Sequence, residues 1–404
     1  MRVLLVTDWL RESGGMERYF ETIRQGLRSA GHEVRLLTST AGSAAGGTAE
    51  YRAFGSNAPA AQALLQVVNP FAVARVKAAA RDFRPELALV GMVEQHLSPA
   101  VLAALGNVPK ILSVGDYKPI CPIHSKLLPS GERCEVPAGL VCWTGGCVGL
   151  AHWLRDQPRY ALFRAAIARA DHIIACSSWL QRALGDAGIA AEAVALPTPP
   201  PAPDYVRAPA ARPLFVYVGR LSREKGVASL IRAFARAREA VPAAELRIVG
   251  DGEERRSLER LSASLGLDAA VSFQGSLSLA VVEQELAVAW ASVAPSLWAE
   301  PLGLAAAEAV VRGVPVIASS IGGLAEIVEH GRSGLLFPNG DEAALTQCLE
   351  EVATRRAFPD QILPAEVVRE LADRHSSERY VARLESIADE LHAQAYSVTT
   401  RSPS

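Results

Sequence analysis

The sequence predicts an α/β protein with two doubly wound, Rossmann-like domains whose parallel sheets face each other across a cleft. Short apolar runs rich in β-branched residues alternate with helical stretches along most of the chain. The alternation stops at the proline-rich segment 198–213 and starts again after it. With 404 residues, half of them apolar, the chain is long enough to bury two cores. We therefore expect one domain over 1–197, a linker over 198–213 and a second domain over 214–369.

The first domain opens with a strand–helix–strand pattern. An apolar strand over 2–7 precedes Gly14 and Gly15, a helical pattern runs over 16–30, and a second strand follows at 34–38. A glycine turn at this point brings backbone amides close to a phosphate, although paired glycines in such turns often serve the turn alone. Further apolar strands are expected at 86–90, 110–114 and 172–176. Repeated units of this kind imply a parallel sheet covered by helices on both faces.

The second domain repeats the pattern after the linker. Ligands of such sheets bind beyond the carboxyl ends of the strands. A helical run over 364–393 closes the pattern, and the polar tail 396–404 is expected to be mobile. The predicted strands of this domain are 214–218, 245–249, 271–274, 292–295, 314–318 and 334–337, with helices at 227–240 and 257–265.

Charge and composition limit the partners and the compartment. A formal net charge of −2 gives no general case for nucleic acid. The half of the chain up to Pro200 is net basic and the remainder net acidic, which fits either a peripheral contact with an anionic membrane or ordinary solvated arginines. The apolar run at 1–10 is too short for a signal peptide, and no run reaches the ~18 apolar residues of a membrane span. We expect a cytoplasmic protein, at the inner face of the membrane if the basic half binds there.

The segment 296–328 is the most informative part of the chain. Glu300 precedes an Ala-rich helix, Glu308 lies within that helix, and Gly313 with Pro315 ends it. The amides at the helix start, near Gly303 and Leu304, can receive a diphosphate, while the two carboxylates can accept hydrogen bonds from sugar hydroxyls. A pair of solvated glutamates is the alternative interpretation for such spacing in isolation.

Cationic and glycine-rich loops follow other strands of the same domain. Gly219 ends the strand at 214–218, and Arg220 and Lys225 lie in the loop after it. Arginine offers a planar fork for phosphate oxygens, and lysine adds a compact charge. Gly250 follows the next strand, and Gly322–Gly323 follows 316–319. Loops of one domain thus converge on one predicted site, although cations in surface loops are often merely solvated.

Together these segments resemble the group 1 retaining glycosyltransferases, glycosyltransferase family 4, which have the GT-B fold. The resemblance spans nearly the whole chain, and each motif is weak alone whereas their order is specific. The matching segments are GGMERYF, GRLSREKG, IVGDGEE, SLWAEPLGLAAAEA, GVPVIAS and GRSGLLFPNGD.

The resemblance implies a role for each matching residue. Arg220 and Lys225 would contact the diphosphate of a nucleoside diphosphate sugar, Glu308 the ribose hydroxyls, and Glu300 the transferred sugar. Fixed cations and amides would then stabilise the leaving diphosphate without a catalytic metal. The remaining donor-binding positions are the glycine turns and the helix start, at Gly14, Gly15, Gly219, Gly250, Gly303 and Leu304.

The resemblance also implies the reaction and the placement of the C-terminus. The sugar would pass with retention to a hydroxyl of a lipid-linked glycan, a polysaccharide or a small metabolite. Residues 370–395 would cross back to the first domain as a helix. Two alternatives stay open: a GT-B epimerase or phosphorylase, and a nucleotide-sugar-binding scaffold without turnover.

One position departs from the family pattern. Related enzymes often present a histidine beside the sugar after the strand at 110–114, where this chain has Gly115 followed by Asp116. Asp116 is therefore a candidate for orienting the donor sugar or the acceptor hydroxyl, with a structural turn as the alternative.

A cysteine-rich segment over 116–150 interrupts the first domain. It contains Cys121, Cys134, Cys142 and Cys147 among prolines and glycines. Four thiolates could hold a structural zinc ion and order this segment. Their irregular spacing lacks the paired C-x-x-C pattern of strong zinc sites, so a loop of reduced thiols is the other interpretation. A subset of the resembling enzymes carries similar cysteines here.

Overall fold

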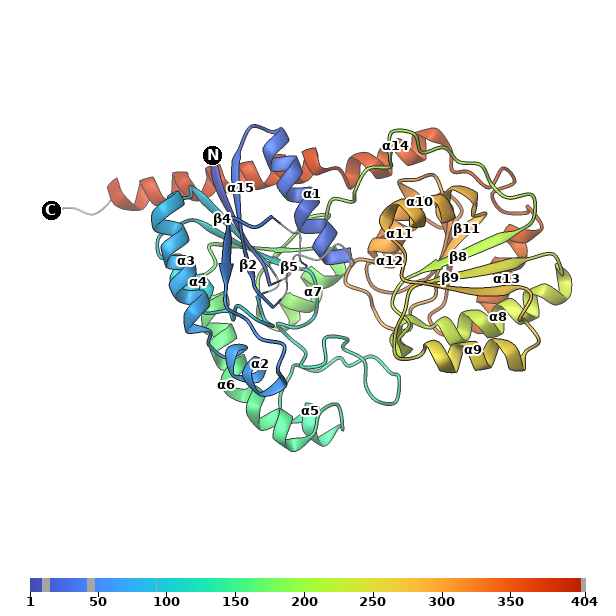
Figure 1. The fold of residues 1–404 in the computed structure, drawn as a ribbon, viewed down its shortest axis with the longest axis horizontal. Helices are drawn as coiled ribbons and strands as arrows, with labels where there is room; N and C mark the ends of the chain where they lie inside the picture. The colour runs from blue at the N-terminus through green and yellow to red at the C-terminus, as the bar shows by residue number, and fades with distance from the viewer. Residues whose placement is uncertain (9–14, 42–47, 92, 401–404) are drawn as a thin grey trace. The chain divides into compact units, whose positions relative to one another are not determined.

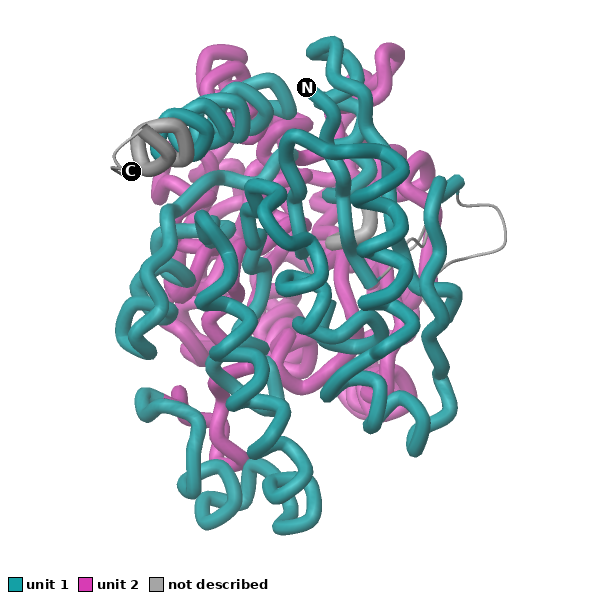
Figure 2. The backbone as a smooth tube through the Cα atoms, turned by 90° about the vertical axis from the view of Figure 1, so that its left-hand side faces the viewer, with its two compact units in different colours: residues 1–124, 135–197, 376–404 teal, residues 125–134, 198–375 magenta. Residues whose placement is uncertain are grey.

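The computed structural model describes residues 1–8, 15–41, 48–91 and 93–400 (Figure 1). The chain divides into two compact units (Figure 2). Unit 1 comprises residues 1–124, 135–197 and 376–404, and unit 2 comprises residues 125–134 and 198–375. In the part of the chain that the structure describes, no helix combines the length and apolarity that crossing a bilayer requires.

Unit 1 is built on a seven-stranded parallel sheet with the order β3-β2-β1-β4-β5-β6-β7. The predicted strands at its centre are present, and two short edge strands, β3 and β7, extend the sheet beyond the prediction. The strands are β1 (Arg2–Val6), β2 (Glu33–Ser39), β3 (Tyr51–Ala53), β4 (Leu87–Gly91), β5 (Lys110–Val114), β6 (His172–Ala175) and β7 (Glu192–Ala193).

The helices of unit 1 begin where local sequence favours them. The Asn69 side chain accepts hydrogen bonds from two amides in the first turn of α3, and Pro70 occupies its first position. The Ser177 hydroxyl caps α7 in the same way. The helices are α1 (Gly15–Ser29), α2 (Pro59–Leu65), α3 (Pro70–Phe83), α4 (Val101–Ala104), α5 (Val141–Thr144), α6 (Leu150–Ile167), α7 (Ser178–Asp186) and α15 (Ser377–Thr400).

Unit 2 contains a six-stranded parallel sheet with the order β10-β9-β8-β11-β12-β13. The predicted strands all appear, and their apolar side chains form a core with those of α8 and α13. The strands are β8 (Leu214–Val218), β9 (Glu245–Val249), β10 (Val271–Gly275), β11 (Ala291–Ala294), β12 (Val316–Ser319) and β13 (Gly334–Phe337). The helices are η1 (Arg223–Lys225), α8 (Val227–Ala240), α9 (Arg255–Ser264), α10 (Leu279–Val288), α11 (Leu304–Val310), α12 (Leu324–Ile327), α13 (Glu342–Ala353) and α14 (Ala365–Arg374).

The proline-rich segment is extended and tied to unit 2. The Arg207 guanidinium donates hydrogen bonds to the carbonyls of Ala287, at 2.9 Å, and Ala289, at 2.7 Å. The amide of Ala208 bonds to the carbonyl of Ala287 as well. Because these bonds use backbone carbonyls at the end of α10, they fix the path of a segment that has no regular structure of its own.

The C-terminal helical run differs from the sequence expectation. It is divided at His375 into α14, which belongs to unit 2, and α15, which belongs to unit 1. The chain therefore rejoins unit 1 at Ser376 rather than at Glu370. Helix α15 also continues to Thr400, into the segment that was expected to be a mobile tail.

Helix α15 is attached to α1 by close packing and by hydrogen bonds. A Cβ atom on Gly26 would lie 2.8 Å from the Ser377 Cβ, so the glycine permits the contact. The hydroxyls of Tyr19 and Tyr380 are 2.6 Å apart, and that of Tyr19 is 3.0 Å from Ser113 on β5. This buried network joins the last helix to the first helix and to the sheet.

Candidate functional site

Three loops of unit 2 meet at the carboxyl ends of β8, β11 and β12. Their close approach depends on glycine. A Cβ atom on Gly226 would lie 2.0 Å from the carbonyl oxygen of Pro295, and one on Gly322 would lie 2.5 Å from that of Glu300. No larger residue fits at either position without moving backbone. The neighbouring strands β8, β11 and β12 bring these loops together, as expected for a ligand site in a parallel sheet.

Lys225 and Glu300 form an ion pair at this meeting point. The Lys225 Nζ lies 3.0 Å from a carboxylate oxygen of Glu300, and the two side chains are 19% and 12% exposed. The Ser296 hydroxyl donates a hydrogen bond to the same oxygen. The Lys225 ammonium also lies over the Trp298 ring, 5.4 Å from its centroid. A half-buried pair with these additional partners is held in one geometry, unlike an exposed pair of flexible side chains.

The start of α11 is fixed by the same loops. Gly303 adopts a φ of 96°, a left-handed conformation that favours glycine, and Leu304 begins the helix. The amide of Gly323 donates a 2.7 Å hydrogen bond to the carbonyl of Glu300, which ties the loop before α11 to the loop after β12. Glu308 lies on α11 and is 4% exposed. Glu308 is thus buried and the Glu300 side chain is largely shielded, which the solvated-glutamate interpretation does not predict.

Arg220 has a different environment from Lys225. Its side chain is 66% exposed and lies 3.4 Å from the Glu224 carboxylate. The Tyr217 hydroxyl donates a 2.8 Å hydrogen bond to the Arg220 carbonyl and so positions the start of the loop. Of the two cations predicted to bind the diphosphate, Lys225 is therefore anchored and Arg220 is exposed.

The remaining residues predicted to bind the donor are glycines. Two of them, Gly219 and Gly250, lie at turns of unit 2. Gly250 has a φ of 136°, and a Cβ atom there would lie 1.8 Å from the Gly219 carbonyl oxygen, so these two turns are in contact. Gly15 is the first residue of α1 in unit 1. Gly14 lies outside the described residues.

In unit 1, acidic residues gather beyond the carboxyl ends of β1, β4 and β5. Asp8 follows β1 and is fully buried, and its carboxylate accepts hydrogen bonds from three successive amides after β4. Burial raises the pKa of Asp8 to about 6, against the lowering effect of these bonds. The donor amides are those of Gln95, His96 and Leu97, at 2.6 to 3.0 Å.

Asp116 lies beside charged groups of the same region. Its carboxylate accepts a 2.8 Å hydrogen bond from the Lys118 amide and lies 3.8 Å from the His124 ring. Burial opposes the ionisation of Asp116. Its interactions with the His124 ring, and with the amide and charge of Lys118, nevertheless keep the pKa of Asp116 below its usual value. Burial and the Asp116 charge raise the pKa of Glu94, and burial lowers the pKa of the Lys118 ammonium.

Asp8 and Glu94 were not among the residues predicted from the sequence. Both follow strands of the predicted parallel sheet, as Asp116 does, and this shared position after a strand could have identified them as candidates. The sequence does not show which of these carboxyl groups is buried, since burial depends on the packing of the loops between them.

The four predicted zinc ligands do not form a metal site. In the described ranges, no three His, Cys, Asp or Glu side chains come together in a way that could hold a metal ion. All six cysteines of the chain are within those ranges, and none forms a disulfide. Cys121 and Cys142 are buried, and Cys134 and Cys147 are partly exposed. The residues present therefore do not fit the structural zinc that their number suggested.

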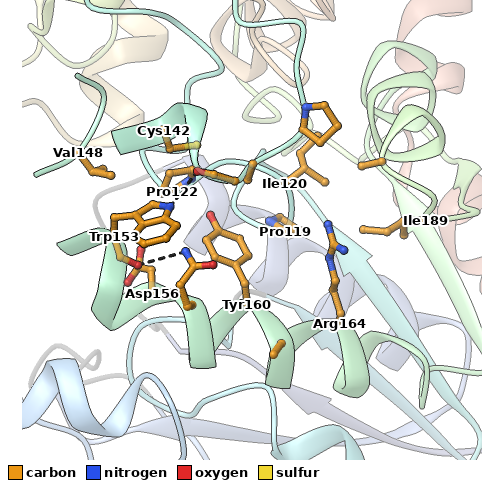
Figure 3. A pocket seen from close by; sticks show the side chains of 16 residues that line it. Pro119, Ile120, Pro122, Cys142, Val148, Trp153, Asp156, Tyr160, Arg164 and Ile189 are labelled. Carbon is orange, nitrogen blue, oxygen red and sulfur yellow. Dashed lines mark hydrogen bonds between the residues drawn. The ribbon is translucent and has the colours of Figure 1, made fainter. Parts of the chain in front are cut away.

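Unit 1 also contains a cavity of about 340 Å³. Figure 3 shows it between α6, which carries Trp153, Tyr160 and Arg164, and the cysteine-rich segment, which contributes Ile120 and Cys142. The residues that follow α7, including Ile189, close one side.

Comparisons with known proteins find a matching protein family for each half of the chain. The model of the family "Glycosyl transferases group 1" matches residues 204–365, and that of "Glycosyltransferase Family 4" matches residues 13–199. A 2-deoxystreptamine N-acetyl-D-glucosaminyltransferase of Streptomyces fradiae is 36% identical over 160 residues, which is 38% of each chain. A D-inositol 3-phosphate glycosyltransferase of Nocardioides is 34% identical over 164 residues, 37% of this chain and 36% of that protein. The chain thus spans little more than a third of these curated relatives.

Solved structures show the same fold. A sucrose-phosphate synthase from Thermosynechococcus elongatus matches with a TM-score of 0.66 and 23% identity over all of both chains. The HepE protein of Anabaena, solved in complex with UDP, matches with a TM-score of 0.67 and 18% identity over 96% of this chain and all of that one. These similarities, with the two parallel sheets, confirm the predicted GT-B fold. The chain is a member of the group 1 glycosyl transferases, glycosyltransferase family 4.

Proposed function

We propose that this protein is a retaining glycosyltransferase that moves a sugar from a nucleoside diphosphate sugar to a hydroxyl acceptor. One observation carries the proposal above the others: Lys225 and Glu300, on loops distant in sequence, are paired at the carboxyl edge of a parallel sheet. A cation for the departing diphosphate and a carboxylate for the sugar hydroxyls are the two groups that this transfer requires side by side.

Unit 2 supplies the donor site in this proposal. Lys225 and the exposed Arg220 contact the diphosphate, and their positive charge offsets the charge that develops as the glycosidic bond to the diphosphate breaks. Glu308 accepts hydrogen bonds from the ribose hydroxyls, and Glu300 accepts them from the transferred sugar. The glycine turns at Gly219 and Gly250 let the ligand approach backbone, since a side chain at either position would occupy that space.

Unit 1 supplies groups for the acceptor. Asp116 is held ionised by His124 and Lys118, so it can accept a hydrogen bond from a hydroxyl and orient it. Glu94 beside it favours its protonated form and can donate a hydrogen bond. The pair thus offers one acceptor and one donor for the hydroxyls of a polyol. No metal enters this proposal, because fixed cations carry the charge, and zinc has no place in it.

We also propose where the enzyme acts and on what. The net positive charge of the first half of the sequence supports a location in the cytoplasm at the inner face of the membrane, because anionic lipids there attract basic residues. The acceptor is a lipid-linked glycan, a polysaccharide or a small molecule with a hydroxyl group. HepE of Anabaena, which has the same fold, is described as binding UDP, so UDP-sugars are the first donors to test.

A thermal-shift panel of nucleoside diphosphate sugars tests the donor site. A matched donor at about 100 times its dissociation constant should stabilise the protein by about 2.7 kcal/mol, whereas the free sugar should not. Lys225→Ala should reduce the shift, and Arg256→Ala, which removes an exposed cation of α9, should leave it unchanged. If no nucleotide or nucleotide sugar shifts the melting temperature, the donor site assigned to unit 2 is wrong.

A further inference from the structure

The walls of the cavity of about 340 Å³ in unit 1 combine rigid apolar side chains with polar groups. Pro119, Pro122 and Pro137 line it from the cysteine-rich segment, and Trp153 lines it from α6. The Trp153 indole nitrogen donates a 2.9 Å hydrogen bond to the Gly139 carbonyl, so the ring is fixed against the same segment. Prolines and a bonded indole lose little freedom when a ligand binds, which favours a preformed site.

A buried hydroxyl at the floor of the cavity has no partner. The Tyr160 side chain lines the cavity, and its oxygen is almost entirely buried and makes no hydrogen bond with any described residue. Figure 3 shows the Tyr160 ring rising from α6 between Trp153 and Arg164, with its oxygen on the side of the cysteine-rich segment. Burial raises the pKa of this phenol, so it remains protonated and can donate. Buried polar groups usually have a partner, and a ligand in the cavity would supply one.

The charges around the cavity are unbalanced. Asp156 is 2% exposed, and its carboxylate lies 3.1 Å from Arg155 and 3.2 Å from both Arg159 and His152, so its charge is already matched. Arg164 also lines the cavity and has no ion-pair partner in the described ranges. Asp156 is the single acidic residue of α6, against three arginines. The cavity therefore favours an anion.

Exposed apolar side chains surround the same two elements. Large apolar residues are normally scattered singly over a surface, whereas here they gather on α5, on the first turns of α6 and on the residue before α5. The Trp143 ring of α5 lies 6.0 Å from the ring of Trp153, which connects this surface to the cavity wall. The exposed residues are Leu140, Val141, Trp143, Leu150 and Leu154.

We propose that the cavity binds an anionic amphiphile, an organic phosphate or carboxylate with an apolar chain or ring. Arg164 pairs with the anion, Tyr160 donates a hydrogen bond to it, and the proline and indole walls contact the apolar part. This rests on the proposed function in one respect: the ligand is the non-reacting part of the glycosyl acceptor. The cysteine-rich segment then has a role that requires no metal, since it forms the roof of this site.

Octyl phosphate, below its micellar concentration, is the probe that tests the site. Calorimetric titration of the full-length protein should give one binding site. Octyl glucoside, which lacks the charge, and inorganic phosphate, which lacks the chain, should each bind at least about tenfold more weakly. Equal binding of octyl glucoside would overturn the anion preference, and equal binding of inorganic phosphate would overturn the apolar subsite.

Variants locate the binding and separate it from folding defects. Arg164→Gln and Tyr160→Phe should each lower the affinity for octyl phosphate, by about tenfold for the arginine. Arg169→Gln, which removes an exposed arginine just beyond α6, should not change it. An unchanged affinity in both cavity variants, with melting temperatures like that of the parent, would overturn the proposal.

A second arm identifies the source of the amphiphile. Vesicles of phosphatidylcholine with phosphatidic acid should sediment the protein if the ligand is a membrane lipid, and Trp143→Glu should then reduce sedimentation. Binding of octyl phosphate without sedimentation would assign the site to a soluble acceptor. Loss of binding in both arms would overturn the proposal, while an intact thermal shift with a nucleoside diphosphate sugar would leave the proposed transferase function standing.

Discussion

The ammonium of Lys225 lies 3.0 Å from the carboxylate of Glu300, although the two residues belong to loops after different strands of unit 2. The pair also fixes each group for its proposed task. A lysine that is already oriented loses little freedom when it meets a diphosphate, and the same holds for a glutamate that meets a sugar. Ser296 and Trp298 complete the support from the loop that carries Glu300.

Removal of the anchored cation should affect turnover more than removal of the exposed one. Lys225→Ala should lower kcat by about a hundredfold or more, because the leaving diphosphate loses a fixed counter-charge. Arg220→Ala should lower it less, since the Arg220 side chain is 66% exposed and more strongly screened. Steady-state kinetics with a matched donor measures both. A larger effect at Arg220 would mean that the ion pair with Glu300 does not mark the reaction centre.

The two glutamates should separate into different kinetic roles. Glu308→Ala should weaken binding of the bare nucleoside diphosphate by roughly 1.5–3 kcal/mol, the value of a charge-assisted hydrogen bond. Glu300→Gln should leave nucleoside diphosphate affinity nearly unchanged and lower kcat with the nucleotide sugar. Calorimetry with the nucleoside diphosphate, followed by kinetics, distinguishes them. The assignment fails if Glu300→Gln impairs nucleotide binding as strongly as Glu308→Ala does.

Asp8 should make stability depend on pH. Its pKa is about 6 in the folded protein, against 3.8 for an ordinary aspartate, so the folded state binds more protons between these two pH values. Stability should therefore fall as pH rises from about 4 to about 6, by roughly 2–3 kcal/mol for this group. Asp8→Asn should remove this part of the slope. Urea unfolding at several pH values tests it, and parallel curves for the parent and the variant would contradict the buried, proton-binding state of Asp8.

The hydroxyl network of α15 should contribute to stability in a graded way. Tyr380→Phe removes one hydrogen bond, to Tyr19, and should cost about 1 kcal/mol. Tyr19→Phe removes the bonds to both Tyr380 and Ser113 and should cost more. Denaturant unfolding of the two variants gives the comparison. Equal stability of both variants and the parent would show that these hydroxyls contribute nothing to the attachment of the helix.

The cysteine-rich segment should carry less than one zinc ion per chain. Its four cysteines do not come together as ligands in the described part of the chain, so the thiols should hold no metal and should all react once the protein is unfolded. Elemental analysis of protein purified without added metal, together with thiol titration in denaturant, measures this. Stoichiometric zinc that is lost in a Cys142→Ser variant would restore the metal-site interpretation.

The order and type of the main elements could be predicted from the sequence. The alternation of apolar strands with helices, and glycines such as Gly219 and Gly250 directly after strands, are local signals that can be read without knowledge of the fold. The edge strands β3 and β7 were missed because they are short and have little apolar pattern. The division at His375 was missed because the helical pattern continues on both sides of it.

By itself, the sequence determined the two α/β halves, the family and the residue types that a nucleotide-sugar site requires. Only the tertiary structure decided which of these residues meet. The contact of Lys225 with Glu300 depends on β8 and β11 being neighbours in the sheet, and strand order is not written in any local pattern. Burial of Asp8, and the cavity beneath the cysteine-rich segment, likewise depend on how distant loops pack, because desolvation and enclosed volume arise only when separate segments are brought together.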